Sequence, residues 1–137
     1  MDNKSNIVAV TALVKNREWD KFLILKRNQD EIAYPWKWAF PGWKLEPWEV
    51  LMETLKREVL EEVWLEIENY KEYLWDFTFM RKDWHNVVWI TFMVTAKNED
   101  VILDKEFEWH EWIFPQELDK YDYIPWMDKE VKQAFSK

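Results

Sequence analysis

The chain has 137 residues, 34% of them charged, a formal net charge of −8 and no cysteine. This length suits one domain, and the negative charge disfavours a general nucleic-acid-binding surface, so we expect no nucleic-acid polymer as a partner. The lack of cysteine excludes disulfides, cysteine metal sites and a cysteine nucleophile.

Hydrophobic patterning in the first third of the chain predicts short strands. Residues 7–14 and 21–26 are apolar runs rich in β-branched side chains. The polar stretch 15–20 joins them, which is the pattern of a β-hairpin. A loop over residues 28–36 follows and leads to a brief strand at 38–40, just before a Pro-Gly pair.

The rest of the chain predicts two helices and three further strands. The first helix is placed at 47–63, because proline is favoured in the first helical turn. Strands mixed with two helices at irregular intervals favour an α+β fold, in which a sheet packs between helices, over a regular parallel α/β fold. The remaining expected elements are strands at 73–80, 86–96 and 111–114, a turn at 81–85 and a closing helix at 125–135.

The helix expected at 47–63 carries the most informative pattern of the chain. At about 100° per residue, Glu58, Glu61 and Glu62 fall within roughly a third of its circumference. Like charges held this close raise one another's pKa unless a cation neutralises them, so the cluster is either fully solvated or a site for a hard metal ion. The apolar residues on another face, expected to be core, are Leu51, Leu55, Val59 and Val63.

The segment from Trp43 to Leu65 resembles the signature of the Nudix hydrolases. In that signature a glycine, a glutamate, an Arg-Glu pair, two adjacent glutamates, a second glycine and an aliphatic residue occur at fixed spacing. The two glycine positions hold Trp43 and Trp64 here. The positions that match in residue type and spacing are Glu49, Arg57, Glu58, Val59, Glu61, Glu62 and Leu65.

Tryptophan also occupies other positions that are typical of glycine. The chain has 12 Trp and 1 Gly, whereas glycine is about 7% of ordinary domains. We hypothesise that the sequence is a glycine-to-tryptophan altered version of a Nudix protein, through a recording error or a deliberate change; the alternative is a natural Trp-rich domain. An intact mass equal to that of the printed sequence would exclude the recording error. The tryptophans in turn-like contexts outside the signature include Trp19, Trp48, Trp84 and Trp126.

The resemblance implies a fold and a metal-dependent chemistry. It implies a mixed β-sheet sandwiched between α-helices, with residues 1–137 forming one Nudix domain. It also implies that Glu58, Glu61 and Glu62 bind Mg²⁺, or Mn²⁺ in its place, together with the backbone carbonyl of Gly42. The general base varies within the family, and we favour Glu58. We expect Arg57 to orient a neighbouring glutamate by a bidentate pair.

Three positions outside the helix are also assigned to the site, the first two of them by the same resemblance. Glu106, which we prefer to Glu108, is expected to be a further acidic ligand, with a solvated acidic loop as the alternative. Arg27 is expected to contact a substrate phosphate, with an ordinary surface arginine as the alternative. Phe40 is assigned to a base pocket, although aromatic residues in strands are more often core.

These features together predict an enzyme that hydrolyses nucleotides. The leading function is Mg²⁺-dependent hydrolysis of a nucleoside triphosphate, ordinary or oxidised, to the monophosphate and pyrophosphate. The runner-up substrate is ADP-ribose or another nucleoside-diphosphate-linked compound. An alternative of another class is an inert nucleotide-binding module, in which Trp43 and Trp64 distort the metal loop and the helix end.

Several properties are not fixed by the sequence. The base, the sugar, the attacked phosphorus and the oligomeric state stay open, although homodimers are common in this family. No apolar run reaches membrane-spanning length, and residues 1–6 lack the regions of a signal peptide. We therefore expect a cytoplasmic protein without a membrane partner.

Overall fold

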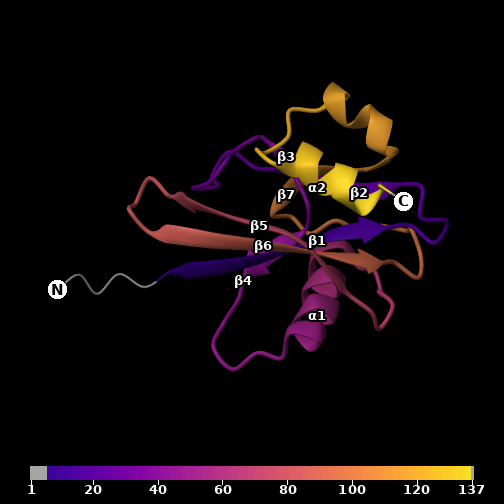
Figure 1. Cartoon of the computed structure of the whole chain (residues 1–137), viewed down its shortest axis with the longest axis horizontal. Helices are drawn as coiled ribbons and strands as arrows, with labels where there is room; N and C mark the ends of the chain where they lie inside the picture. Colours follow the sequence, from indigo (N-terminus) through magenta and orange to yellow (C-terminus); the bar gives the residue numbers. More distant parts are fainter. Residues whose placement is uncertain (1–5, 137) are drawn as a thin grey trace.

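A mixed sheet lies between helices in the computed structural model, which describes residues 6–136 (Figure 1). Helix α1 (Leu51–Val63) covers one face of the sheet. Helix α2 (Met127–Ala134) and the 3-10 helix η1 (Pro115–Lys120) lie across the opposite face. This arrangement confirms the expected α+β fold with a sheet between helices. Within the described residues, no helix is both long and apolar enough to cross a bilayer.

Strand β1 (Ile7–Lys15) is the centre of the sheet. It runs parallel to β6 (Asn86–Thr95) along one edge, and on its other edge it pairs antiparallel with β4 (Gly42–Lys44) and then with β2 (Phe22–Arg27). The strand order is β3-β2-β1-β6-β5, with β4 added beside β1 and β7 beside β2. The other strands are β3 (Trp38–Ala39), β5 (Glu72–Met80) and β7 (Phe107–Ile113).

Both faces of β1 are buried, which explains its nearly continuous apolar sequence. Successive strand residues point to opposite faces, so Val10 and Ala12 pack toward α1, whereas Leu13 packs toward α2. The α1 stripe meets β1 there, and its members Leu55 and Val59 are 0% exposed. Burying each large apolar side chain contributes about 1.5–3 kcal/mol, so this packing holds α1 to the sheet.

Helix α1 begins at Leu51, four residues later than the expected start at Pro47. The backbone of Trp48 has φ 71° and that of Val50 is extended, so neither continues a right-handed helix. Pro47 therefore belongs to the preceding turn rather than to the first helical turn. Glu49 therefore lies in the loop before α1, and its carboxylate accepts a hydrogen bond from Thr54 of that helix.

The last strand also differs from its expected position. Strand β7 begins at Phe107 rather than at residue 111, because it pairs with β2 along most of that strand's length. Glu108 thus lies in a strand, and only Glu106 of the two candidate ligands lies in the preceding turn. Strand β4 and helix η1 were not predicted, since both are too short to give a periodic pattern.

Tryptophan dominates the left-handed backbone positions of the described residues. Seven non-glycine residues there have positive φ, and six of them are tryptophan. An L-residue in this region costs roughly 1–2 kcal/mol. Trp48 is 100% exposed, so its side chain gains little packing energy that could offset the cost of this backbone conformation. The side chain of Trp43 lies outside the described part of the chain. The six residues are Trp19, Trp36, Trp48, Trp64, Trp84 and Trp126.

We expect Trp64→Gly to stabilise the fold by about 1 kcal/mol, because Trp64 ends α1 with φ 60° and glycine adopts this conformation without strain. The side chain is 58% exposed, so little packing is lost. Denaturant unfolding measures the difference. Trp109→Gly is the matched control, since Trp109 is 56% exposed but lies in β7 outside the left-handed region. An equal gain in both variants would show that backbone strain is not the cause.

Candidate metal and nucleotide site

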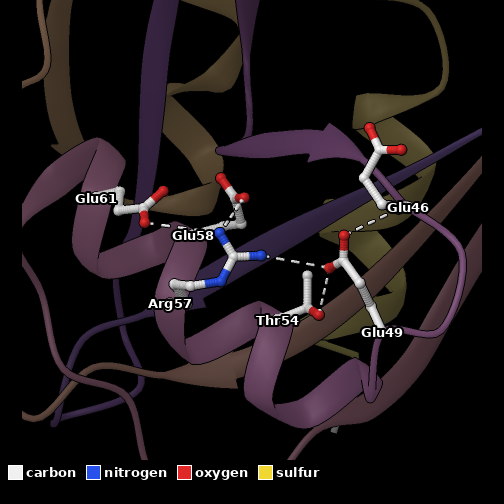
Figure 2. Close-up of polar contacts among 6 residues, drawn as sticks. All are labelled: Glu46, Glu49, Thr54, Arg57, Glu58 and Glu61. Carbon is white, nitrogen blue, oxygen red and sulfur yellow. Dashed lines mark hydrogen bonds and ion pairs between the residues drawn. The ribbon is translucent and has the colours of Figure 1, made fainter.

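Arg57 on α1 connects three carboxylates (Figure 2). Its Nη1 lies 2.9 Å from Glu58 Oε1 and 3.6 Å from Glu61 Oε1, and its Nη2 lies 3.4 Å from Glu49 Oε2. A planar guanidinium fixes the direction of each carboxylate that it contacts. Arg57 is therefore placed to orient Glu58, the residue favoured as the base.

The Glu49 carboxylate links the loop before α1 to the first turn of that helix. Its Oε2 accepts a hydrogen bond of 2.5 Å from the Thr54 hydroxyl, and its Oε1 accepts one of 3.0 Å from the backbone N–H of Glu46 (Figure 2). The Thr54 bond, with the help of Arg57, lowers the pKa of Glu49. Glu49 thus stays ionised and keeps Arg57 pointing toward the glutamates.

Glu62 is the buried member of the glutamate cluster. It is 6% exposed, and its Oε1 has no hydrogen-bond partner among the described residues. Burial raises the pKa of Glu62 well above its ordinary value, and the nearby charges of Glu58 and Glu106 raise it further, whereas the Gly42 N–H, which donates to the carboxylate, opposes the shift. A buried carboxylate with one oxygen atom left without a partner is stabilised by a proton or a cation.

The surrounding acidic groups strengthen the case for a cation. Burial raises the pKa of Glu58, and burial together with Asp104 raises that of Glu106. In the part of the chain that the structure describes, no three such side chains are already arranged to hold a metal. The donor set still fits a divalent cation, because the expected ligands are carboxylate and carbonyl oxygens and Glu62 Oε1 has no hydrogen-bond partner in the described structure. Binding would require these side chains to close around the ion.

The glutamates differ in their exposure, which the helical spacing alone did not reveal. The side chain of Glu61 is 58% exposed and that of Glu58 is 20% exposed, whereas Glu62 is buried. The cluster is therefore not fully solvated. It spans the boundary between the protein interior and solvent, where an ion could enter and still retain water.

A pocket of about 230 Å³ lies beside this cluster and gathers five of the expected site residues. Arg57, Glu58 and Glu61 do not line it. The lining combines charged side chains with apolar and aromatic ones, which suits a ligand that carries both phosphates and an aromatic base. The five expected residues are Arg27, Phe40, Gly42, Glu62 and Glu106; the rest of the lining includes Glu31, Lys44, Phe79, Arg81, Val87 and Trp89.

Arg27 is held inside the pocket rather than on the surface. Its side chain is 16% exposed, its Nη2 lies 3.1 Å from Glu31 Oε1, and its Nε donates to the Ala33 carbonyl at 3.0 Å. Burial lowers its pKa, while the charges of Glu31 and Glu62 counteract the shift. Phe40 is 3% exposed, so it belongs both to the core and to the pocket wall.

Sequence reasoning missed several lining residues. Glu31 lies in a loop without periodicity, so nothing indicated its pairing with Arg27. Thr11 and Trp89 are on neighbouring strands, and only the β1–β6 register brings them together. Arg81 was assigned to a turn without a role. The alternation of β6 places Trp89 on its buried face, which is the signal that could have identified this residue.

A helix that gathers carboxylates next to an arginine-containing pocket defines a class of proteins that handle phosphates with a divalent cation. The model of the NUDIX domain family matches residues 5–135. The chain therefore belongs to the Nudix family, and the fold and the Nudix signature agree with that assignment.

Known proteins support the assignment in sequence and in structure. The nucleoside triphosphatase NudI of Escherichia coli O17:K52:H18 is 29% identical over 110 residues, which cover 74% of this chain and 78% of that protein. The MutT protein of Methanosarcina mazei Go1 is 25% identical, with a TM-score of 0.78 over 98% of this chain and 96% of that one. The NUDIX domain of Shewanella oneidensis NrtR, solved with ADP ribose, is 16% identical, with a TM-score of 0.77 over 99% and 92% of the two chains. The chain is thus a MutT-like hydrolase, a Nudix-type pyrophosphohydrolase.

Proposed function

We propose that the protein hydrolyses a nucleoside triphosphate, ordinary or oxidised, to the nucleoside monophosphate and pyrophosphate, with Mg²⁺ or Mn²⁺. The observation that carries the proposal is the buried Glu62 carboxylate, whose Oε1 has no hydrogen-bond partner in the described structure, in a pocket that is also lined by Arg27 and by aromatic side chains. The similarity to proteins described as nucleoside triphosphatases favours this substrate class.

The metal ligands would be Glu58, Glu61, Glu62 and Glu106, with the carbonyl of Gly42. A bound divalent cation supplies charge neutralisation at the phosphoryl oxygens and lowers the pKa of a bound water. The buried position of Glu62 excludes competing water from one side. The repulsion that destabilises these carboxylates in the free protein then favours cation binding.

The remaining site residues orient the reacting groups. Glu58 would accept the proton of the attacking water, since it is partly exposed and Arg57 fixes its carboxylate. Arg27 would contact a phosphate, because its position is fixed by Glu31. Phe40 and Trp89 would line the nucleoside half of the pocket.

Product identification tests the proposal. The purified chain is incubated with Mg²⁺ and a panel of ordinary triphosphates, oxidised triphosphates and ADP-ribose. We expect metal-dependent release of monophosphate and pyrophosphate from a triphosphate. Turnover of ADP-ribose alone would replace the proposed substrate with a diphosphate-linked one. Release of inorganic phosphate in place of pyrophosphate would show attack at another phosphorus.

A further inference from the structure

A second buried carboxylate lies on α2, away from the carboxylates of α1. Glu130 is 1% exposed, and its Oε2 has no hydrogen-bond partner in the described structure. Its carboxylate is hydrogen-bonded to the hydroxyl of Thr91 on β6. A buried carboxylate is costly, and nothing in the proposed hydrolysis uses it.

Hydrogen bonds lead from Glu130 to the nucleotide pocket. Thr91 Oγ1 lies 2.8 Å from Thr11 Oγ1, and Trp89 Nε1 donates to Thr11 Oγ1 at 3.1 Å. Both threonines are 1% exposed and Trp89 is 6% exposed, so water does not compete for these bonds. Thr11 and Trp89 both line the pocket.

The proton count gives this chain of bonds a direction. A threonine hydroxyl has one proton to donate. If Thr91 donates to ionised Glu130, then Thr11 must donate to Thr91, and the Thr11 oxygen is left to accept from Trp89. Burial raises the pKa of Glu130 to about 7, against the opposing effect of the Thr91 bond. Because Glu130 accepts at one end of this row of hydrogen bonds, the direction of the hydroxyl proton is fixed in both Thr91 and Thr11.

Thr11 also packs against the expected metal ligand Gly42, its partner on the neighbouring strand β4. A Cβ atom built on Gly42 would lie 2.5 Å from Thr11 Cγ2, so the Thr11 methyl group fills the space that a side chain at position 42 would need. Thr11 therefore contacts both Gly42 and Trp89. Trp89 in turn packs against Phe77, whose ring is stacked on it at 5.4 Å, and Trp126 stacks on Phe77 at 4.3 Å.

We propose that Glu130 and Thr91 are positioning residues for nucleoside binding, because through Thr11 they hold the Trp89 side chain in the orientation that lines the pocket. The ligand class rests on the proposed function. The base half of the nucleotide is the part that depends on Trp89, whereas the phosphates depend on the metal and Arg27.

Isothermal titration in the presence of Mg²⁺ tests this separation. The ligands are a panel of nucleoside 5′-monophosphates and inorganic pyrophosphate, which lacks a base. For Thr91→Val and Glu130→Leu, which remove the hydroxyl and its acceptor, we expect monophosphate affinity to fall about tenfold, within the range for a base–aromatic contact, and pyrophosphate affinity to stay within about twofold. In turnover, KM should rise while kcat is retained.

Two further variants separate positioning from a general loss of structure. Thr91→Ser keeps the hydroxyl and should restore monophosphate affinity. Thr95→Val alters a threonine of the same strand that takes no part in the hydrogen bonds between Thr91, Thr11 and Trp89, and should leave both affinities unchanged. Unchanged monophosphate affinity in Thr91→Val, or an equal loss for both ligands, would overturn the inference. A wild-type protein that binds monophosphate but hydrolyses no triphosphate would contradict the proposed function alone.

Discussion

Replacement of Glu58 by glutamine should lower kcat by about 10²–10⁴-fold while the protein stays folded, because the amide cannot accept the proton of the attacking water. The glutamine keeps the length of the side chain and can still accept from Arg57, whose Nη1 lies 2.9 Å from Glu58 Oε1. We therefore expect the melting temperature to change by only a few degrees and KM to change little. Steady-state kinetics and thermal unfolding of the same preparation measure both quantities.

Glu53→Gln is the matched control for this substitution, since Glu53 is an exposed glutamate on the same helix. It removes one negative charge from α1 without touching the site, so its kcat should equal that of the wild type. A Glu58→Gln enzyme with the wild-type rate would assign the base to another carboxylate. The inert-module alternative predicts no metal-dependent turnover in any of the three proteins.

Replacement of Glu62 by glutamine should move activity and metal-free stability in opposite directions. Burial and the nearby charges of Glu58 and Glu106 destabilise the Glu62 carboxylate at neutral pH. A neutral amide removes this repulsion, so the metal-free variant should unfold at a higher denaturant concentration than the wild type. Turnover should fall by orders of magnitude, because the buried member of the metal cluster is lost.

Stabilisation by Mg²⁺ distinguishes the loss of a metal ligand in Glu62→Gln from the loss of a surface charge in Glu53→Gln. A ligand that binds only the native state, at a hundred times its dissociation constant, stabilises a protein by about 2.7 kcal/mol. Mg²⁺ should therefore stabilise the wild type and Glu53→Gln, but have little effect on Glu62→Gln. Equal stabilisation of all three proteins by Mg²⁺ would show that Glu62 is not a ligand.

The sequence predicted those parts of the site that depend on local spacing. Helical periodicity placed Leu55 and Val59 in the core, and the signature placed Arg57 beside Glu58. Spacing along one helix does not report depth, so it did not distinguish buried Glu62 from Glu61, whose side chain is 58% exposed. Depth depends on what packs against the helix.

Contacts between segments far apart in the sequence could not be predicted from it, because they depend on strand register and on loop paths. Thr11 and Thr91 meet only because β1 and β6 pair in one register, and a shift of one strand by one residue would turn its threonine to the other face of the sheet. The pairing of Arg27 with Glu31 depends on a loop whose path has no pattern in the sequence. The turn-like tryptophans were recognisable, because residues such as Asp83 and Pro125 beside them mark turns.

The parallel pairing of β1 with β6 has a consequence for the order of folding. Ile7 pairs with Val87 and Lys15 with Thr95, so β1 finds its parallel partner only after the whole segment between the two strands has been synthesised. Such non-local pairing carries a loop-closure cost that must be met before the contacts form, and it slows folding. Until then one edge of β1 has no partner, and the face that packs against α2 (Met127–Ala134) stays uncovered for longer still, because α2 follows β6 in the chain. During synthesis, this strand, which is largely buried in the native protein, therefore stays exposed to aggregation until these later segments have been made.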